Sequence, residues 1–232
     1  MRGKHLWLLL LIPACALGAR AQAATEARFA SLFENQDVAA FSLELPARSR
    51  ATVYQGTHDV IWLALNDGTV NFVRRGKSAG EALATGDVRF FPAFQLSVVS
   101  NDQARPARGV LIQLKARGLA NGGCGCGAAT ESAICGCPNA AHLPELWALA
   151  LGQITLGGTT LRASEGFRGS NHRDNMLMVA ITDLELRDDV AAVESPDGAF
   201  SLAAGQARWI PAGAHQFRNT GGSTARFLTI EF

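Results

Sequence analysis

The stretch GDVRFFPAFQLSVVSNDQARPARGVLIQL (86–114) recurs in altered form as GQARWIPAGAHQFRNTGGSTARFLTIEF (205–232). A glycine, an arginine and a proline keep their spacing in both copies (Gly86, Arg89 and Pro92; Gly205, Arg208 and Pro211). The match extends upstream, where 53–72 parallels 166–186 with one extra residue in the second copy. A repeat of about one hundred residues has the size of a domain and not of a solenoid unit. The sequence therefore predicts a duplicated domain, in which differences between the copies show which one kept a chemical function.

Both copies consist of short segments rich in β-branched and apolar residues, separated by turn-forming residues such as those at 66–68 and 196–198. A strand every eight to twelve residues or so is typical of an all-β sandwich or barrel and not of βαβ units. A short amphipathic helix or turn is expected at 25–36, and a short helix at 143–151, just before the first strand of each copy. In the first copy the expected strands are 41–45, 51–54, 60–65, 69–74, 88–91, 94–99 and 108–114.

The N-terminus has the pattern of a secretory signal peptide: basic MRGKH, apolar LWLLLLIPACAL and small residues at 21–23. We expect cleavage after Ala23 and an exported protein, periplasmic or secreted; a lipobox-like context around Cys15 makes a lipoprotein the alternative. Without 1–23 the chain has 18 basic and 20 acidic residues, a net charge of −2. No basic run remains, which argues against nucleic acid as a partner, and no later segment has the length and apolarity of a membrane span.

The second copy carries a recognisable motif: residues 211–215 (PAGAH) and Asn219 resemble the second motif of the cupin family, with one residue fewer before His215. Residues 171–174, followed by an apolar strand, stand where the first cupin motif would be. The resemblance covers nearly all of the chain after the leader. It implies an all-β bicupin, with two tandem cupin-type jelly-roll barrels and a Gly/Cys-rich linker. The expected domains are a signal peptide (1–23), a first cupin-like barrel (24–117), the linker (118–142) and a second cupin-like barrel (143–232).

Cupins usually hold a metal ion through two histidines and a glutamate of the first motif and a histidine of the second. Of this set, the second copy keeps His172, Asp174 and His215, which the resemblance makes a candidate site for one divalent transition metal (Fe, Mn, Cu or Zn). The glutamate position falls near 176–178, where methionines stand. In the first copy Leu96 or a neighbour replaces the second-motif histidine, so we expect the first barrel to be metal-free.

Four further residues are candidates for lining a ligand pocket: His58, Trp62, Arg208 and Phe217. Arg208 has two interpretations, a structural ion pair or a carboxylate-binding group, because guanidinium forks serve both uses. The expected function is binding of a small molecule in the second barrel. The alternative is a metal-dependent oxidoreductase or lyase, such as a dioxygenase or decarboxylase, or an isomerase, acting on a small oxygenated organic substrate. The resemblance also implies pairing into a homodimer.

All cysteines after the leader lie in the linker, as C-x-C-x8-C-x-C (Cys124, Cys126, Cys135 and Cys137). In an exported protein such a cluster indicates two disulfides. Neighbours in C-x-C pair poorly with each other, so the pairs would be 124–137 with 126–135, or 124–135 with 126–137. The other interpretation is a four-thiolate Zn²⁺ or Cu(I) site, with His142 nearby, which would give the linker a metal-binding or redox role.

Overall fold

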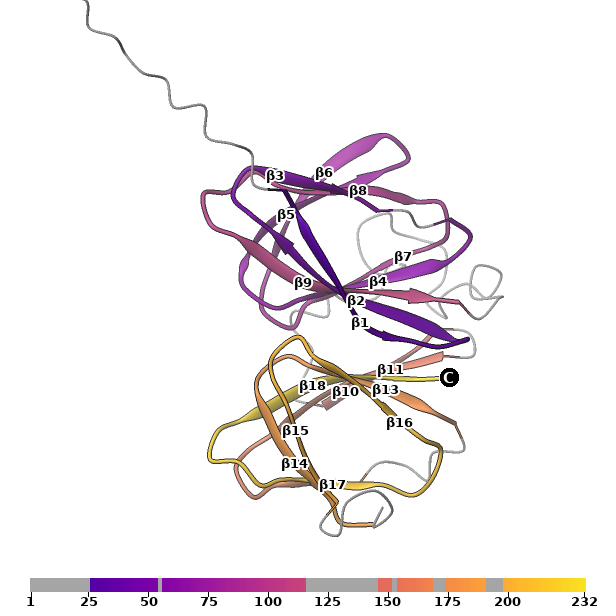
Figure 1. Cartoon of the computed structure of the whole chain (residues 1–232), viewed down its shortest axis with the longest axis vertical. Helices are drawn as coiled ribbons and strands as arrows, with labels where there is room; N and C mark the ends of the chain where they lie inside the picture. The colour runs from indigo at the N-terminus through magenta and orange to yellow at the C-terminus, as the bar shows by residue number, and fades with distance from the viewer. Residues whose placement is uncertain (1–25, 54–55, 116–145, 152–153, 169–173, 191–197) are drawn as a thin grey trace, which may run out of the picture.

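The computed structural model describes residues 26–53, 56–115, 146–151, 154–168, 174–190 and 198–232. Within them, the first copy of the repeat forms two antiparallel sheets that face each other (Figure 1). Its five-stranded sheet has the order β1 (Arg28–Glu34), β2 (Val38–Leu45), β9 (Ala107–Leu114), β4 (Asp59–Ala64), β7 (Val88–Phe91). Its four-stranded sheet has the order β3 (Ser49–Thr52), β8 (Leu96–Asn101), β5 (Gly68–Arg74), β6 (Lys77–Leu83).

The second copy repeats this arrangement strand for strand. Its five-stranded sheet has the order β10 (Leu146–Leu151), β11 (Ile154–Leu161), β18 (Ala225–Glu231), β13 (Met176–Ala180), β16 (Ala207–Ile210). Its four-stranded sheet has the order β12 (Gly166–Arg168), β17 (Gln216–Asn219), β14 (Leu184–Asp188), β15 (Ala199–Leu202). The prediction of two all-β jelly-roll barrels is thus confirmed. None of the described residues belongs to a helix that is long and apolar enough to cross a membrane.

The helix expected at 25–36 is wrong, because this segment contains β1, an edge strand that pairs with β2. The register of β1 shifts just before Phe33, and this bulge brings both Leu32 and Phe33 against the core between the barrels. A bulge interrupts the two-residue alternation of a strand. Phe29, Leu32 and Phe33 therefore imitate helical spacing although the backbone is extended.

The helix expected at 143–151 is also wrong, since β10 occupies 146–151 and pairs with β11 along its whole length. Periodicity alone does not distinguish a short apolar strand from a short helix. In the first copy, β6 is a strand that the sequence did not predict, because its residues are mostly small or polar. A tight turn at Arg75 and Gly76, both with positive φ (47° and 78°), directs β6 back along β5.

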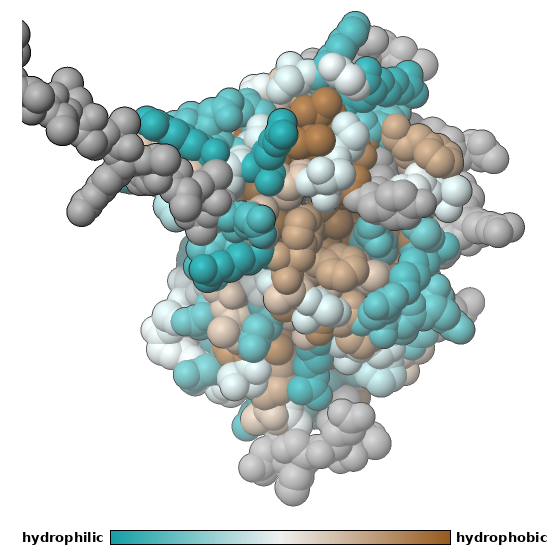
Figure 2. Space-filling model, turned by 45° about the horizontal axis from the view of Figure 1, so that its top comes forward, coloured by the Kyte–Doolittle hydropathy of each residue, from teal (hydrophilic) through white to brown (hydrophobic). Residues whose placement is uncertain are grey.

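The two five-stranded sheets pack against each other and join the barrels (Figure 1). Strand β4 shows the effect, because all six of its residues are buried. Val60 and Trp62 face the interior of the first barrel, whereas Ile61 and Leu63 belong to an apolar core shared with Leu177 of β13 and other second-barrel residues. Figure 2 shows apolar side chains gathered in a band down one face of the molecule. Burial on both faces explains why the strands at this interface are continuous apolar runs and do not alternate.

The repeated glycine has a physical reason at this interface. Gly86 and Gly205 have φ of +95° and +85°, a region that side chains rarely adopt. A Cβ on Gly205 would lie 2.7 Å from Cδ1 of Leu65 in the other barrel, and one on Gly86 would lie 2.7 Å from Nη2 of Arg226. Arg226 Nη2 also donates to the carbonyl oxygen of Thr85 at 3.1 Å. Each glycine thus allows the left-handed conformation of its own turn and leaves room for a side chain of the other barrel.

Aromatic side chains fill the first barrel. Trp62 meets Phe72 edge to face at 5.9 Å, and Phe72 packs on Phe91 at 4.9 Å between ring centroids. A Cβ at Gly109 would overlap the indole ring of Trp62, so this glycine makes room for it. Trp62 is fully buried in this core. The structure thus places Trp62 in the core packing of the first barrel, outside the pocket of the second.

Candidate functional site

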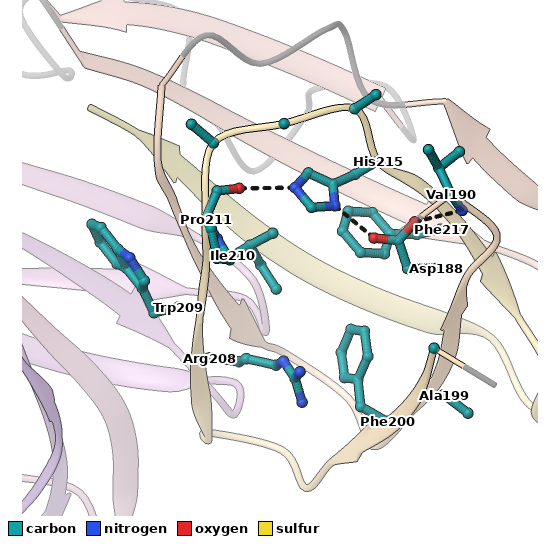
Figure 3. A pocket seen from close by; sticks show the side chains of 14 residues that line it. Asp188, Val190, Ala199, Phe200, Arg208, Trp209, Ile210, Pro211, His215 and Phe217 are labelled. Carbon is teal, nitrogen blue, oxygen red and sulfur yellow. Dashed lines mark hydrogen bonds and ion pairs between the residues drawn. The ribbon is translucent and has the colours of Figure 1, made fainter. Parts of the chain in front are cut away.

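A pocket of about 380 Å³ opens in the second barrel between the edges of its two sheets (Figure 3). Strand β15 ends the four-stranded sheet and β16 ends the five-stranded sheet, so the sheets part between these two strands. The loop at 211–215, which carries the cupin-like motif, borders the same space. Most lining residues are apolar, and the ionisable ones are Asp188, Arg208 and His215.

Stacked planar groups form one wall of the pocket. The guanidinium of Arg208 lies over the ring of Phe200, with Cζ 4.4 Å from the ring centroid. Phe200 in turn meets Phe217 edge to face at 6.1 Å, and His215 stacks on Phe217 at 5.6 Å with an interplanar angle of 7°. Two predicted pocket residues, Arg208 and Phe217, therefore line one cavity, together with the motif histidine.

Asp188 and His215 form a buried pair beside these rings, each 8% exposed. His215 Nδ1 lies 2.5 Å from Asp188 Oδ2, and His215 Nε2 lies 2.8 Å from the carbonyl oxygen of Pro211. Asp188 Oδ1 accepts from the backbone N–H groups of Val190 and Gln216 at 3.1 and 3.0 Å. Both ring nitrogens of His215 are therefore directed at oxygen atoms of the protein. The ring thus ties its loop to the end of β14.

This bonding bears on the candidate metal set. In the arrangement described, neither nitrogen of His215 directs a lone pair at a metal ion. Asp174 is exposed, and His172 lies outside the described residues. Across the described ranges, no group of three or more His, Cys, Asp or Glu side chains is placed to hold a metal. The described residues alone therefore do not form the transition-metal site that the resemblance implies, and the complete set with His172 stays a prediction.

The leader, the four linker cysteines and His142 also lie outside the described residues. Disulfides, a thiolate metal site and export stay predictions for that reason.

The repeated arginine has different neighbours in the two barrels. In the first, Arg89 Nε donates to Glu81 Oε2 at 2.6 Å, and Glu81 also pairs with Arg74. Glu81 stands five residues before Gly86, and Phe200 stands five residues before Gly205, so the two occupy equivalent positions. The structural ion pair expected for this arginine is present in the first barrel. In the second barrel the equivalent wall residue is an aromatic ring.

His58, the fourth predicted pocket residue, lies in the first barrel beside Asp59 and does not line the second-barrel cavity. Asp59 Oδ1 accepts from the backbone N–H of Ala93 at 2.7 Å, as Asn175 Oδ1 accepts from Ala212 at 3.1 Å in the second copy. Burial raises the pKa of the Asp59 carboxyl, although this hydrogen bond and the nearby charge of His58 oppose the rise. Asp59 therefore anchors the proline loop of the first barrel, and Asn175 anchors that of the second.

Sequence reasoning missed Asp188 and Phe200. Both flank the connection between β14 and β15, which has ten residues where the matching turn of the first copy has two. Because of this difference in length, the two copies cannot be aligned without a gap beyond residue 186. An ungapped alignment therefore does not match Phe200 with Glu81. Counting backward from Gly86 and Gly205 is the signal that finds Phe200.

Comparison with known proteins identifies the fold. No protein-family model matches the sequence, and no curated protein does. AerE from Microcystis aeruginosa is similar in structure with a TM-score of 0.64 and 11% identity, over 90% of this chain and 94% of that one. Bacillus subtilis oxalate decarboxylase OxdC gives 0.57 and 13%, over 88% and 72%, and a cupin 2 conserved barrel domain protein from Leptotrichia buccalis gives 0.53 and 10%, over 89% and 88%. The chain therefore has the cupin fold in two tandem copies, as the motif predicted.

Proposed function

We propose that the second barrel binds a small organic molecule with a flat apolar body and an anionic group. The observation that carries this proposal is the pocket between β15 and β16, whose wall of stacked rings includes one guanidinium. Its volume of about 380 Å³ is in the range of small-molecule sites, which are mostly apolar with a few placed polar groups. The ring faces of Phe200 and Phe217 suit a planar ligand.

The polar groups of the wall are compatible with an anion near Arg208. Asp188 Oδ1 accepts from two backbone N–H groups, and Asp188 Oδ2 lies against Nδ1 of His215, so the carboxylate has partners within the protein. Arg208 brings a guanidinium group to this wall, over the ring of Phe200. Its stacking on Phe200 uses the face of the guanidinium, whereas the N–H donors lie in the guanidinium plane and match a planar anion.

A comparison with the equivalent region of the first barrel supports the proposal of one ligand site per chain, in the second barrel. There Glu81 lies between Arg74 and Arg89, and the ring of Phe91 packs beneath Arg74 with Cζ 4.7 Å from the centroid. Trp62 and Phe72 fill the space behind them. The first barrel thus uses side chains of its own where the second has a cavity, and we expect one ligand per chain.

The test is a fluorescence titration of the chain without its leader with 8-anilinonaphthalene-1-sulfonate, an aromatic anion. Phe200→Glu places the first-barrel carboxylate beside Arg208 and is expected to abolish binding, and Arg208→Gln to weaken it. The control is Phe94→Glu, because Phe94 is 71% exposed and outside the pocket. Unchanged binding by Phe200→Glu, or loss with Phe94→Glu instead, would show that the probe binds elsewhere and refute the proposal.

A further inference from the structure

We infer that the first barrel supports the pocket of the second, and that Phe33 is a positioning residue for the pocket strand β16. This inference rests on the proposed function, because it concerns the same cavity. It gives the first barrel a role that needs no ligand of its own. The contact that carries it joins β1, at the start of the first barrel, to β16 of the second.

Strand β16 has a backbone hydrogen-bonded neighbour strand on one side and none of the described strands on the other. It is four residues long, pairs with β13, and ends its sheet. Its other edge borders the pocket. A short edge strand with one hydrogen-bonded neighbour depends on side-chain contacts for its position.

Those contacts alternate across the strand. Arg208 points toward Phe200 and the cavity, whereas Trp209 lies on the opposite side of the strand (Figure 3). The ring of Trp209 stacks on Phe33 with centroids 5.3 Å apart and an interplanar angle of 9°. It also contacts the ring of Phe232, at 5.6 Å. Trp209 thus contacts the ring of Phe33 from the first barrel and the ring of Phe232, which follows β18 of the second.

The two ring contacts of Trp209 hold β16 and therefore the pocket wall in place, because Trp209 and Arg208 are neighbours on the same strand backbone. If the ring of Phe33 is removed, Trp209 loses its flat partner and β16 can move away from β15. Such a movement would widen the cavity and shift Arg208 relative to Phe200. Phe33 does not line the pocket and stacks on Trp209, so its effect on a ligand would be transmitted through the strand.

Three variants test this inference with 8-anilinonaphthalene-1-sulfonate as the probe. Phe33→Ala is expected to weaken binding by about threefold to tenfold, the range that corresponds to loss of one aromatic pair. Phe33→Tyr keeps the stack and should bind as the wild type does. Phe29→Ala alters the same strand at a residue that is 46% exposed, and should change nothing.

A general loss of stability needs a separate control. Leu114→Ala removes a buried side chain from the same core between the barrels and is expected to lower stability without changing probe affinity. Hydrogen exchange of residues 207–210 without any probe supplies a second readout, which should rise with Phe33→Ala and not with Phe29→Ala. Equal weakening by Leu114→Ala, or unchanged exchange with Phe33→Ala, would overturn the inference. If Phe200→Glu does not affect the probe, the proposed function fails, and the exchange result still decides whether Phe33 positions β16.

Discussion

The approach of the two barrels at Gly205 leads to a quantitative prediction. Gly205→Ala adds a methyl group at φ +85° and places it 2.7 Å from Cδ1 of Leu65. The left-handed conformation costs alanine about 1–2 kcal/mol. Displacing Leu65 from its rotamer adds about 0.5–1.5 kcal/mol, and reduced freedom of the unfolded chain returns about 0.4–1 kcal/mol. We expect a net loss of about 0.5–3 kcal/mol in the free energy of unfolding.

Two other glycines separate these contributions. Gly76 has φ +78° with open space around its Cβ position, so Gly76→Ala carries the conformational cost alone. Gly222 has open space and no left-handed φ, so Gly222→Ala should be neutral or slightly stabilising. The expected order of stability loss is Gly205, then Gly76, then Gly222.

Urea unfolding followed by tryptophan fluorescence and circular dichroism measures the differences, provided that the slopes of the transitions agree. In a Leu65→Ala background, Gly205→Ala should cost no more than Gly76→Ala does, because the methyl group then has room. If Gly205→Ala costs the same with and without Leu65, the contact between the barrels does not constrain this glycine and the reasoning fails.

Two further predictions concern charged groups in the first barrel. Because burial raises the pKa of Asp59 above its ordinary value of 3.8, the folded state is penalised once this carboxyl ionises. Asp59→Asn, which copies Asn175, should therefore raise the melting temperature at pH 7, and the gain should shrink as the pH falls through the raised pKa toward 3.8; a gain that is constant with pH would contradict this. Glu81→Gln should cost about 2 kcal/mol in urea unfolding because it leaves two partly buried guanidinium groups without their carboxylate. The matched Glu34→Gln, at a 59% exposed carboxylate paired with a lysine, should cost less than about 0.5 kcal/mol, and equal costs would refute the assigned difference in burial.

The repeat made the fold predictable from the sequence, because the spacing of glycine, arginine and proline at 86, 89 and 92 recurs at 205, 208 and 211. Strands β7 and β16 lie between the repeated glycine and proline, where the pattern placed them. Strands β1 and β10 could not be found in this way. Their extended backbone depends on pairing with β2 and β11, and a bulge in β1 imitates helical spacing.

The site was predictable only in part. The motif located His215, and Arg208 and Phe217 were also pocket candidates from the sequence; all three lie in one pocket. Asp188 could not be paired with His215 from the sequence, since 27 positions separate them and the pairing depends on how β14 aligns with β17. Contacts across strands are set by register, and no local pattern in either segment encodes it.

The two barrels share a frame and differ in where they place an aromatic ring. Asn101 donates to three backbone carbonyl oxygens and Asn219 to two, so they fix equivalent points in the two copies. Two residues before them stand Val99, which pairs with Phe72, and Phe217, which pairs with Asp188. The aromatic ring thus stands on β5 in the first barrel (Phe72) and on β17 in the second (Phe217), and the second-barrel equivalent of Phe72 is Asp188. This difference keeps aromatic volume in the interior of both barrels and places a polar group beside the cavity of the second. The carboxylate at this position is not left without partners, because His215 and two backbone N–H groups contact Asp188.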